Sequence, residues 1–413
     1  MEPIIKNDAV LLGVLMIILA LIFYTSSSKN PRWKKFYKYI PMLLLCYFIP
    51  SLLTTFGLVD PDQSNLYHVA SRYLLPACLV LLTLSIDLKE ILKLGPKALI
   101  MFFTGTIGVI LGGPLAILIV SYISPETIGG VGPDAVWRGM TTVAGSWIGG
   151  GANQAAMYEI FKPNDDLYSI MITVDVIIAE IWMAFLLLGV GRSDAIDRFF
   201  KADATSVNEL KDKMHEFSTR IARIPSLSDL MVILGIGFGA GTVAHILANK
   251  IAPFIQENAP YLERFSLTSS FFWLIVIATA IGIILSFTKV RKIEGAGASR
   301  VGSVFIYFLV ATIGMKMNIL KIFDAPGLFI VGGIWMAFHV ILLVMIGKLI
   351  RAPYFFLAVG SKANIGGAAS APIVAAAFHP SLAPVGVLLA VLGYAIGTYG
   401  AWVCGILMSA VAP

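Results

Sequence analysis

Two glycine-rich stretches carry the polar residues that could bind a small molecule within an otherwise apolar chain. The first is Gly145-Ser-Trp-Ile-Gly-Gly-Gly-Ala-Asn-Gln-Ala-Ala156, and the second is Gly360-Ser-Lys-Ala-Asn-Ile-Gly-Gly-Ala-Ala-Ser-Ala-Pro372. Both contain the order Ile, Gly, Gly, small, small, polar, over Ile148–Asn153 and Ile365–Ser370. Because glycine runs are unfavourable inside helices, we expect each stretch to interrupt one.

A helix that is interrupted at glycine exposes backbone groups to a ligand. Free N–H groups and the positive end of the helix dipole suit an anion such as a carboxylate, whereas free carbonyls suit Na⁺. The alternative is that the glycines only allow close helix packing. Two matched stretches with an Asn in each favour a functional role. The candidate substrate-binding residues are Ser146, Gly149, Gly150, Gly151, Asn153, Gln154, Ser361, Lys362, Asn364, Gly366, Gly367 and Ser370.

Ionisable side chains within apolar sequence are the next candidates. Lys362 should pair with an anion, supplied either by the substrate or by the protein. Asp175 and Glu180 are candidates for Na⁺ or H⁺ coupling, with a structural ion pair to Lys362 or a bond to a backbone donor as the alternative. For His245 and His339 we expect hydrogen-bonded structural roles.

Composition places these residues in a membrane. The chain has 413 residues, of which 58% are hydrophobic and 13% charged, against about 25% charged in soluble domains. Its apolar runs are long enough to cross a hydrocarbon core about 30 Å thick. The net charge of +6 is explained by Lys and Arg in cytoplasmic loops, so no nucleic-acid partner is expected. The spacing of the three cysteines indicates neither a disulfide framework nor a zinc site.

The apolar segments fall into two halves on either side of a polar linker. We interpret residues 1–190 as a first repeat, 191–226 as a cytoplasmic linker whose Ser206–Arg223 part has helical character, and 227–413 as a second repeat. The expected apolar segments are Ala9–Tyr24, Ile40–Val59, Arg72–Ile86, Ala98–Ile123, Met140–Phe161, Tyr168–Val190, Leu227–Ile255, Leu267–Thr288, Val301–Met315, Ala325–Gly347, Pro353–Phe378 and Ala383–Val411.

Loop charges constrain how these segments cross the membrane. The basic loops 26–39 and 289–300 should both be cytoplasmic, yet seven apolar segments lie between them. Either one segment does not cross, for which the glycine-rich segment Met140–Phe161 is the best candidate, or one loop departs from the charge rule. The first interpretation predicts an all-α polytopic protein with its N-terminus outside. It would contain two inverted repeats, each of five transmembrane helices plus a re-entrant or broken glycine-rich element. The alternative is two discontinuous helices that do cross, which gives twelve spans.

The two glycine stretches also resemble those of the domain-of-unknown-function 819 membrane family, and the resemblance extends over essentially the whole chain. That family is similar to the bile acid:sodium symporters, the glutamate:sodium symporters and the cation:proton antiporters. The resemblance implies a substrate shell at Ile148–Asn153 and Ile365–Ser370. It also implies coupling-cation ligands, with Na⁺ at Asn153, Gln154 and Asn364, and an elevator mechanism in a protein that is often dimeric. The substrate signatures of the better-known relatives are absent from this sequence.

These features predict a secondary active transporter, coupled to sodium, for an organic anion or small polar metabolite. The alternatives are a cation/proton antiporter that uses Asp175 or Glu180, and a non-transporting membrane scaffold whose linker binds partners. No motif for ATP hydrolysis or enzymatic catalysis is found, so we expect no enzyme and no cofactor beyond Na⁺ or H⁺ as the coupling ion. A multi-pass protein of the cell inner membrane, forming a homodimer in the bilayer, is expected.

Overall fold

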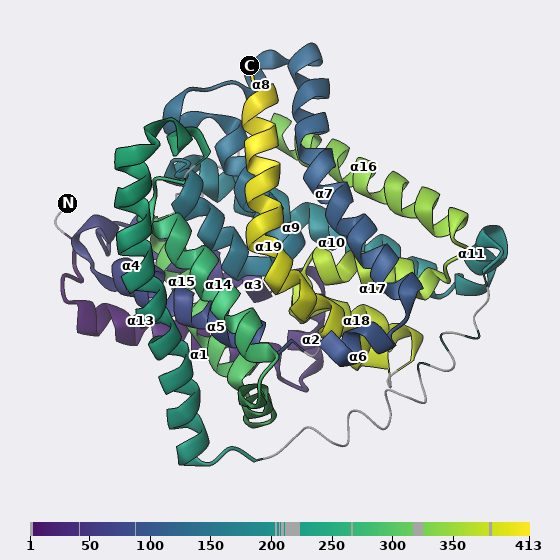
Figure 1. Ribbon diagram of the computed structural model, residues 1–413, viewed down its shortest axis with the longest axis horizontal. Coiled ribbons are helices and arrows are strands. Elements are labelled where there is room, and N and C mark those ends of the chain that lie inside the picture. The colour runs from purple at the N-terminus through teal and green to yellow at the C-terminus, as the bar shows by residue number, and fades with distance from the viewer. Residues whose placement is uncertain are drawn as a thin grey trace.

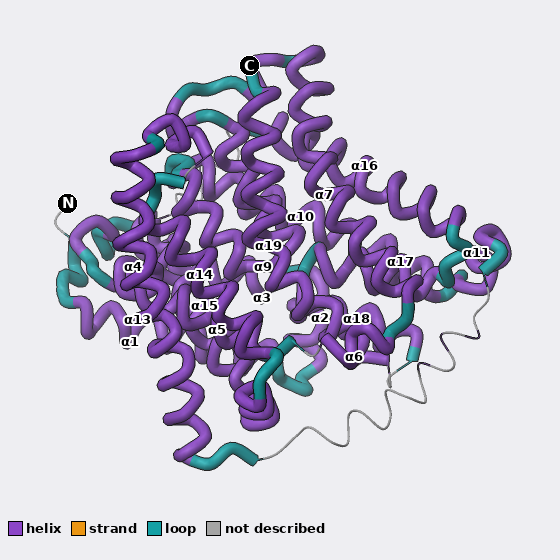
Figure 2. Tube along the Cα trace, viewed as in Figure 1, coloured by secondary structure: helices purple, strands orange, loops and turns teal. Residues whose placement is uncertain are grey.

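The structure is a computed structural model that describes residues 3–40, 42–86, 88–202, 224–265, 267–316, 325–379 and 382–413, together with 205, 207 and 210. Every regular element within these ranges is helical, and Figure 2 shows no strand among them. The expected all-α class is confirmed for the described residues. Apart from residues 207 and 210, the surface helix expected at Ser206–Arg223 lies outside the described residues.

Eight described helices are long and apolar enough to cross a membrane, or nine if the bent pair α14 (Ser270–Ser286) and η5 (Lys289–Ala296) counts as one span. The chain is therefore a polytopic membrane protein. All twelve expected apolar segments contain described helices, although some of these helices, such as α3, do not meet this criterion on their own. Helix α3 ends at Thr55 after 14 residues, because the chain turns through Gly57 with φ +67°, so the expected segment Ile40–Val59 is too long. The eight helices are Asp8–Ser26, Leu66–Leu84, Pro96–Ile123, Asp165–Val190, Leu227–Asn258, Ala298–Lys316, Gly327–Leu349 and Ala383–Val411.

One group of helices, which we call the panel, packs together on the left of Figure 1. Its helix α5 is central, because it contacts α13, α14 and α15. The panel consists of α1 (Asp8–Ser26), α3 (Met42–Thr55), α4 (Leu66–Val69), the π-helical turn η2 (Ala70–Leu74), α5 (Leu75–Leu84), α13 (Leu227–Asn258), α14 and α15 (Ala298–Lys316).

A second group, which we call the core bundle, occupies the centre and right of Figure 1. Helices α9 and α19 pack along each other at its centre, and α7 packs against α16 and α17. The two groups meet where α9 and α19 contact α5 and α14, and where α9 also contacts α15. The core bundle consists of α7 (Pro96–Ile123), α9 (Val136–Phe161), α10 (Asp165–Val190), α16 (Gly327–Leu349), α17 (Tyr354–Asn364), α18 (Gly367–Phe378) and α19 (Ala383–Val411).

Local sequence explains where several of these helices begin. Ser226 and Asp229 form a reciprocal capping box at the start of α13. The Asn164 side chain accepts a bond from Leu167 N at the start of α10, whose first turn is acidic as the helix dipole favours. The shorter elements are α2 (Pro31–Tyr39), α6 (Leu88–Lys93), α8 (Pro125–Ile128), α11 (Ser193–Phe200), η1 (Pro61–Gln63), η3 (Gly132–Asp134), η4 (Pro260–Phe265) and η5.

Both halves of the chain contribute to both groups, in the same order. In each half, panel helices come first, followed by a core helix, a helix interrupted at glycine, and a last core helix. The packing partners also exchange, because α5 contacts α13 and α14 while α15 contacts α1 and α3. This order agrees with a repeat. That the two halves, 1–190 and 227–413, are inverted relative to each other stays a prediction, as does the side of the linker.

Candidate functional site

The first glycine stretch is a helix broken at one residue. Gly150 has φ 72° and ψ −173° inside α9, a conformation that L side chains rarely adopt. Its neighbour Gly149 has a different role. A Cβ there would lie 2.7 Å from the Gly397 Cα of α19, so Gly149 allows two backbones to pack closely. The two interpretations of the glycine run therefore apply to different glycines, while Gly150 and Gly151 stay partly exposed.

The second stretch is also a broken helix. Helix α17 ends at Asn364, and α18 begins at Gly367, after Gly366 with φ 104°. Gly366 is exposed, whereas the residues of α17 that precede it are buried. The first backbone N–H groups of α18 therefore follow an exposed residue, and the helix dipole at this end favours an anion.

The two breaks converge on one residue of α19. A Cβ at Gly393 would lie 2.7 Å from the Ile148 carbonyl oxygen, which precedes the first break. The same Cβ would lie 3.5 Å from the Ala363 carbonyl oxygen, which precedes the second. Carbonyl oxygens that precede the two breaks thus both pack against Gly393, and carbonyl oxygens at broken helices are of the kind that coordinates a cation.

Lys362 and Ser370 border the second break from either side. A Cβ added to Gly366 would overlap the Ser370 Oγ and lie 3.2 Å from the Lys362 Nζ. Ser370 is 8% exposed, and its hydroxyl has no hydrogen-bond partner among the described residues. Lys362 is fully buried, and its Nζ donates to the Ala179 carbonyl at 3.0 Å. An ammonium, a hydroxyl and the N-terminus of α18 together form an arrangement of donors that an anion could accept.

Two carboxylates, Asp175 and Glu180, lie on α10, the helix whose Ala179 carbonyl accepts the bond from Lys362. Glu180 is exposed on the outer side of α10, in a stripe with the exposed residues Ile177, Ile181 and Phe185. Asp175 is instead buried, with 4% of its surface exposed. Its oxygens accept bonds from Trp147 Nε1 at 2.7 Å and Gln154 Nε2 at 2.9 Å, and the Ser146 side chain lies close to it.

The amide of Gln154 connects this buried carboxylate to the panel. Its Oε1 accepts a hydrogen bond from the Tyr47 hydroxyl of α3 at 3.1 Å. Trp147 is fully buried and packs against Trp335 with a centroid distance of 4.9 Å. Three of the expected site residues, Ser146, Gln154 and Asp175, therefore lie together, and the Trp147 ring packs within the protein.

Asn153 and Asn364 hold the broken helices to their neighbours. Asn364 donates to the Phe102 and Gly360 carbonyls at 2.9 and 3.0 Å, and its oxygen accepts from Thr106 Oγ1 at 2.7 Å. Asn153 donates to the Gly149 and Tyr394 carbonyls and accepts from Thr398 Oγ1 at 2.6 Å. Both amides are fully buried, so a ligand contact at either would have to replace a bond to the protein.

Ser361 belongs to a directional chain of hydrogen bonds. Trp182 Nε1 donates to Ser361 Oγ at 2.8 Å, and the same oxygen lies 2.8 Å from His339 Nε2. His339 Nδ1 lies 3.1 Å from the Gly105 carbonyl, so Nδ1 is the donor and Nε2 accepts from Ser361. His245 is also bonded, to the Arg72 carbonyl at 2.8 Å. Both histidines are hydrogen-bonded, as expected, and their structural role stays a prediction.

Sequence reasoning missed the partners of these residues. Thr106 and Thr398 are single polar residues in apolar segments, which is a weak signal, and Tyr47 lies in a third segment. Among the described residues, no three His, Cys, Asp or Glu side chains are placed to hold a metal ion.

Comparisons with known proteins agree with a membrane protein. A family model described as "Protein of unknown function (DUF819)" matches residues 13–411. The chain is also similar to the uncharacterized membrane protein YjcL of Bacillus subtilis, with 24% identity over 358 residues, 83% of each chain.

Proposed function

Given that the chain belongs to the DUF819 family of membrane proteins, we propose that it is a secondary active transporter for an organic anion or other small polar metabolite. The observation that carries the proposal is the arrangement around Gly366. There Lys362, the start of α18 and the Ser370 hydroxyl, which has no partner within the described part of the chain, lie around an exposed glycine. Buried polar groups without partners are rare in proteins, and at such a place they favour a ligand site.

The division into panel and core bundle supports an elevator mechanism. Both breaks lie in the core bundle, and this group contacts the panel mainly through α9 and α19. A substrate bound at the breaks would move with the core bundle while the panel stays in place. We further propose that the halves are inverted repeats, that the N-terminus lies outside, and that a homodimer forms in the cell inner membrane.

Sodium is the coupling ion that we propose. The Ile148 and Ala363 carbonyls beside Gly393 are oxygens of the type that coordinates Na⁺ at broken helices. Asn153, Gln154 and Asn364 are further candidate ligands on the same helices. Coupling would follow if Na⁺ orders the two breaks and thereby completes the anion site.

The second candidate is a cation/proton antiporter, and Glu180 is the residue that favours it. A carboxylate exposed within an apolar stripe of a membrane helix is costly, unless it faces water or binds a cation. Asp175 fits this role less well, because donors already satisfy its oxygens. A scaffold without transport would have no need of Lys362 and Ser370 beside an open break.

The test combines ligand discovery with transport. A metabolite library is screened for compounds that raise the melting temperature of the detergent-purified protein. Compounds that do so are then assayed for uptake into proteoliposomes with an inward Na⁺ gradient, an inward H⁺ gradient or no gradient. Ser370→Ala is the site variant. Ser409→Ala is its matched control, because Ser409 on α19 only donates to the Ile406 carbonyl.

Accumulation that depends on the Na⁺ gradient, is lost in Ser370→Ala and is retained in Ser409→Ala is the expected result. Cation-driven H⁺ flux without uptake of any compound would instead identify an antiporter. If neither uptake of a compound nor H⁺ flux is observed, the proposal is wrong and the non-transporting scaffold is the alternative that remains.

A further inference from the structure

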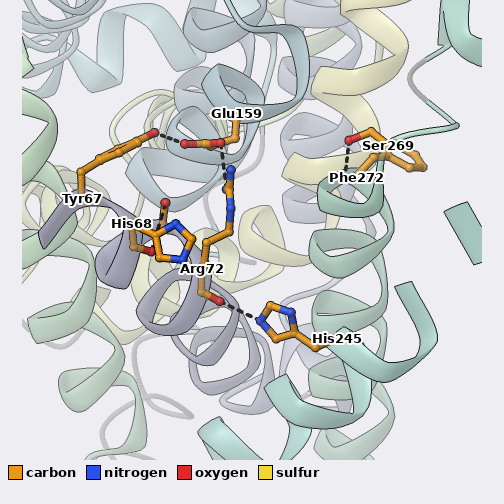
Figure 3. Close-up of polar contacts among 8 residues, drawn as sticks. Tyr67, His68, Arg72, Glu159, His245, Ser269 and Phe272 are labelled. Carbon is orange, nitrogen blue, oxygen red and sulfur yellow. Dashed lines mark hydrogen bonds and ion pairs between the residues drawn. The ribbon is translucent and has the colours of Figure 1, made fainter. Parts of the chain in front are cut away.

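A cluster of charged and aromatic residues connects the panel to the core bundle, apart from the glycine breaks. Arg72 Nη1 of the panel donates to Glu159 Oε2 of α9 at 2.8 Å, and the Tyr67 hydroxyl donates to Glu159 Oε1 (Figure 3). The Glu159 side chain is 9% exposed, and both of its oxygens are bonded to panel residues. Breaking this contact would leave a buried carboxylate without its partners, which is strongly unfavourable.

The panel holds Arg72 in a fixed position. Arg72 lies in the π-helical turn η2, a type of turn that is frequent at functional sites. His245 of α13 is bonded to the Arg72 carbonyl oxygen at 2.8 Å, and Figure 3 shows this contact beside the Arg72–Glu159 pair. The Arg72 guanidinium lies 4.4 Å from the centre of the Phe271 ring of α14. Contacts within three panel elements, η2, α13 and α14, therefore fix the position of Arg72 opposite α9.

A second contact repeats the same distribution of charge. Lys316 at the end of α15 lies 3.9 Å from Asp165, at the start of α10, and over the Tyr67 ring at 4.6 Å. In both pairs the panel supplies the cation and the core bundle supplies the carboxylate. Complementary charge across an interface fixes the register between the two surfaces. A sliding movement of one surface along the other would separate both pairs.

We infer that the Arg72–Glu159 pair, with Tyr67, is a lock that holds the core bundle in its present register on the panel. The lock must open for the core bundle to move, so its strength sets the ratio of the two positions. This inference rests on the proposed elevator movement and assigns that movement to one contact. It places the control of the movement at residues that do not border the glycine breaks.

The lock can be tested by electron–electron distance measurements that need no substrate. Spin labels are attached to Phe56→Cys, beyond α3 of the panel, and Val131→Cys, before α9 of the core bundle. The native residues are 69% and 84% exposed, and the native cysteines Cys46, Cys78 and Cys404 are buried, so labelling is specific. Distance distributions are recorded for the full chain in lipid nanodiscs.

Arg72→Gln and Glu159→Gln should each shift the ratio of two distance populations by about fivefold or more, as expected for removal of one partner of a contacting pair. The charge swap Arg72→Glu with Glu159→Arg should restore the original distribution. The matched control is Asp8→Asn, which removes a carboxylate of α1 that accepts bonds from Ser64 and Asn65, just before α4 of the panel, and should change nothing.

Unchanged distributions in both Gln variants would overturn the lock. The lock would also be overturned if the charge-swap variant gave a distance distribution no closer to the original than those of the single variants. The effect would then not arise from the Arg72–Glu159 pair. These results are independent of the metabolite screen. An absence of uptake with shifted distributions would count against the proposed transport function and not against the lock.

Discussion

The Ser370 hydroxyl and the Lys362 ammonium border the same residue, Gly366, although they belong to the different helices α18 and α17. The space between them exists because Gly366 has no Cβ and takes a backbone conformation with φ 104°. The candidate anion site therefore depends on a residue that has no side chain to bind anything.

Gly366→Ala should close this site. The new Cβ would overlap Ser370 Oγ, and the backbone conformation is one that alanine rarely adopts. We expect a loss of about 1 kcal/mol or more in the free energy of unfolding, together with loss of ligand-induced stabilisation. Thermal melting with and without ligand provides the measurement.

Gly235→Ala is the matched control for that substitution. Gly235 lies within α13, and nothing is within 4 Å of its Cβ position, so alanine should be neutral or stabilising there. Equal melting temperatures and equal ligand effects in the two variants would contradict the role of Gly366.

Asn153→Ala and Asn364→Ala should destabilise the protein. Each variant loses an amide whose oxygen and nitrogen are bonded in the protein, at an expected cost of about 2 kcal/mol or more. Thr106→Val and Thr398→Val, which remove one partner of each amide, should cost less. A variant that melts like the original protein but no longer binds ligand would instead identify the asparagine as a direct ligand.

Glu180→Gln separates sodium-coupled transport from antiport. If carbonyl oxygens at the breaks hold Na⁺, stabilisation of the protein by Na⁺ should persist in this variant. Asp166→Asn removes a different exposed carboxylate from the first turn of α10 and serves as the control. Loss of the Na⁺ effect in Glu180→Gln alone would favour the antiporter.

Asp197 predicts a dependence of stability on pH. Its Oδ1 accepts a bond from Tyr354 N at the start of α17, yet burial is the larger effect and raises the pKa of this carboxyl. A raised pKa means that its favourable contribution is present at low pH and is lost as pH rises above the ordinary value of about 3.9.

The melting temperature of the original protein, measured relative to Asp197→Asn, should therefore fall as pH rises from about 4 towards neutral. Thermal melting of both proteins across this range provides the comparison. The prediction would be contradicted if the difference in melting temperature between the two proteins stayed constant with pH, or grew in favour of the original protein as pH rises. Ionisation of Asp197 would then not destabilise the protein.

The sequence predicted the breaks because glycine is costly inside an apolar helix, and Gly150 and Gly366 both have positive φ. It also marked Lys362, because a cation in apolar sequence needs an anion nearby. The sequence could not distinguish Gly149 from Gly150, because close packing and a backbone conformation with positive φ both select glycine. Only the approach of Gly397 separates the two roles.

The partners across the chain could not be predicted in the same way. Thr106 and Asn364 are 258 positions apart, and no local pattern brings them together. Glu159 and Arg72 carried a usable signal, because charges near the ends of apolar segments need partners. The π-helical turn that positions Arg72 depends on packing against α13 and α14, which single-sequence patterns do not describe.

The central claim is that the second break binds the anionic group of a substrate. The most direct test is the metabolite screen repeated with Lys362→Met, which keeps the length of the buried side chain and removes its charge. The account predicts that the compounds stabilising the original protein carry an anionic group and lose their effect in Lys362→Met. Stabilisation mainly by neutral or cationic compounds, or by anions equally in both proteins, would contradict it.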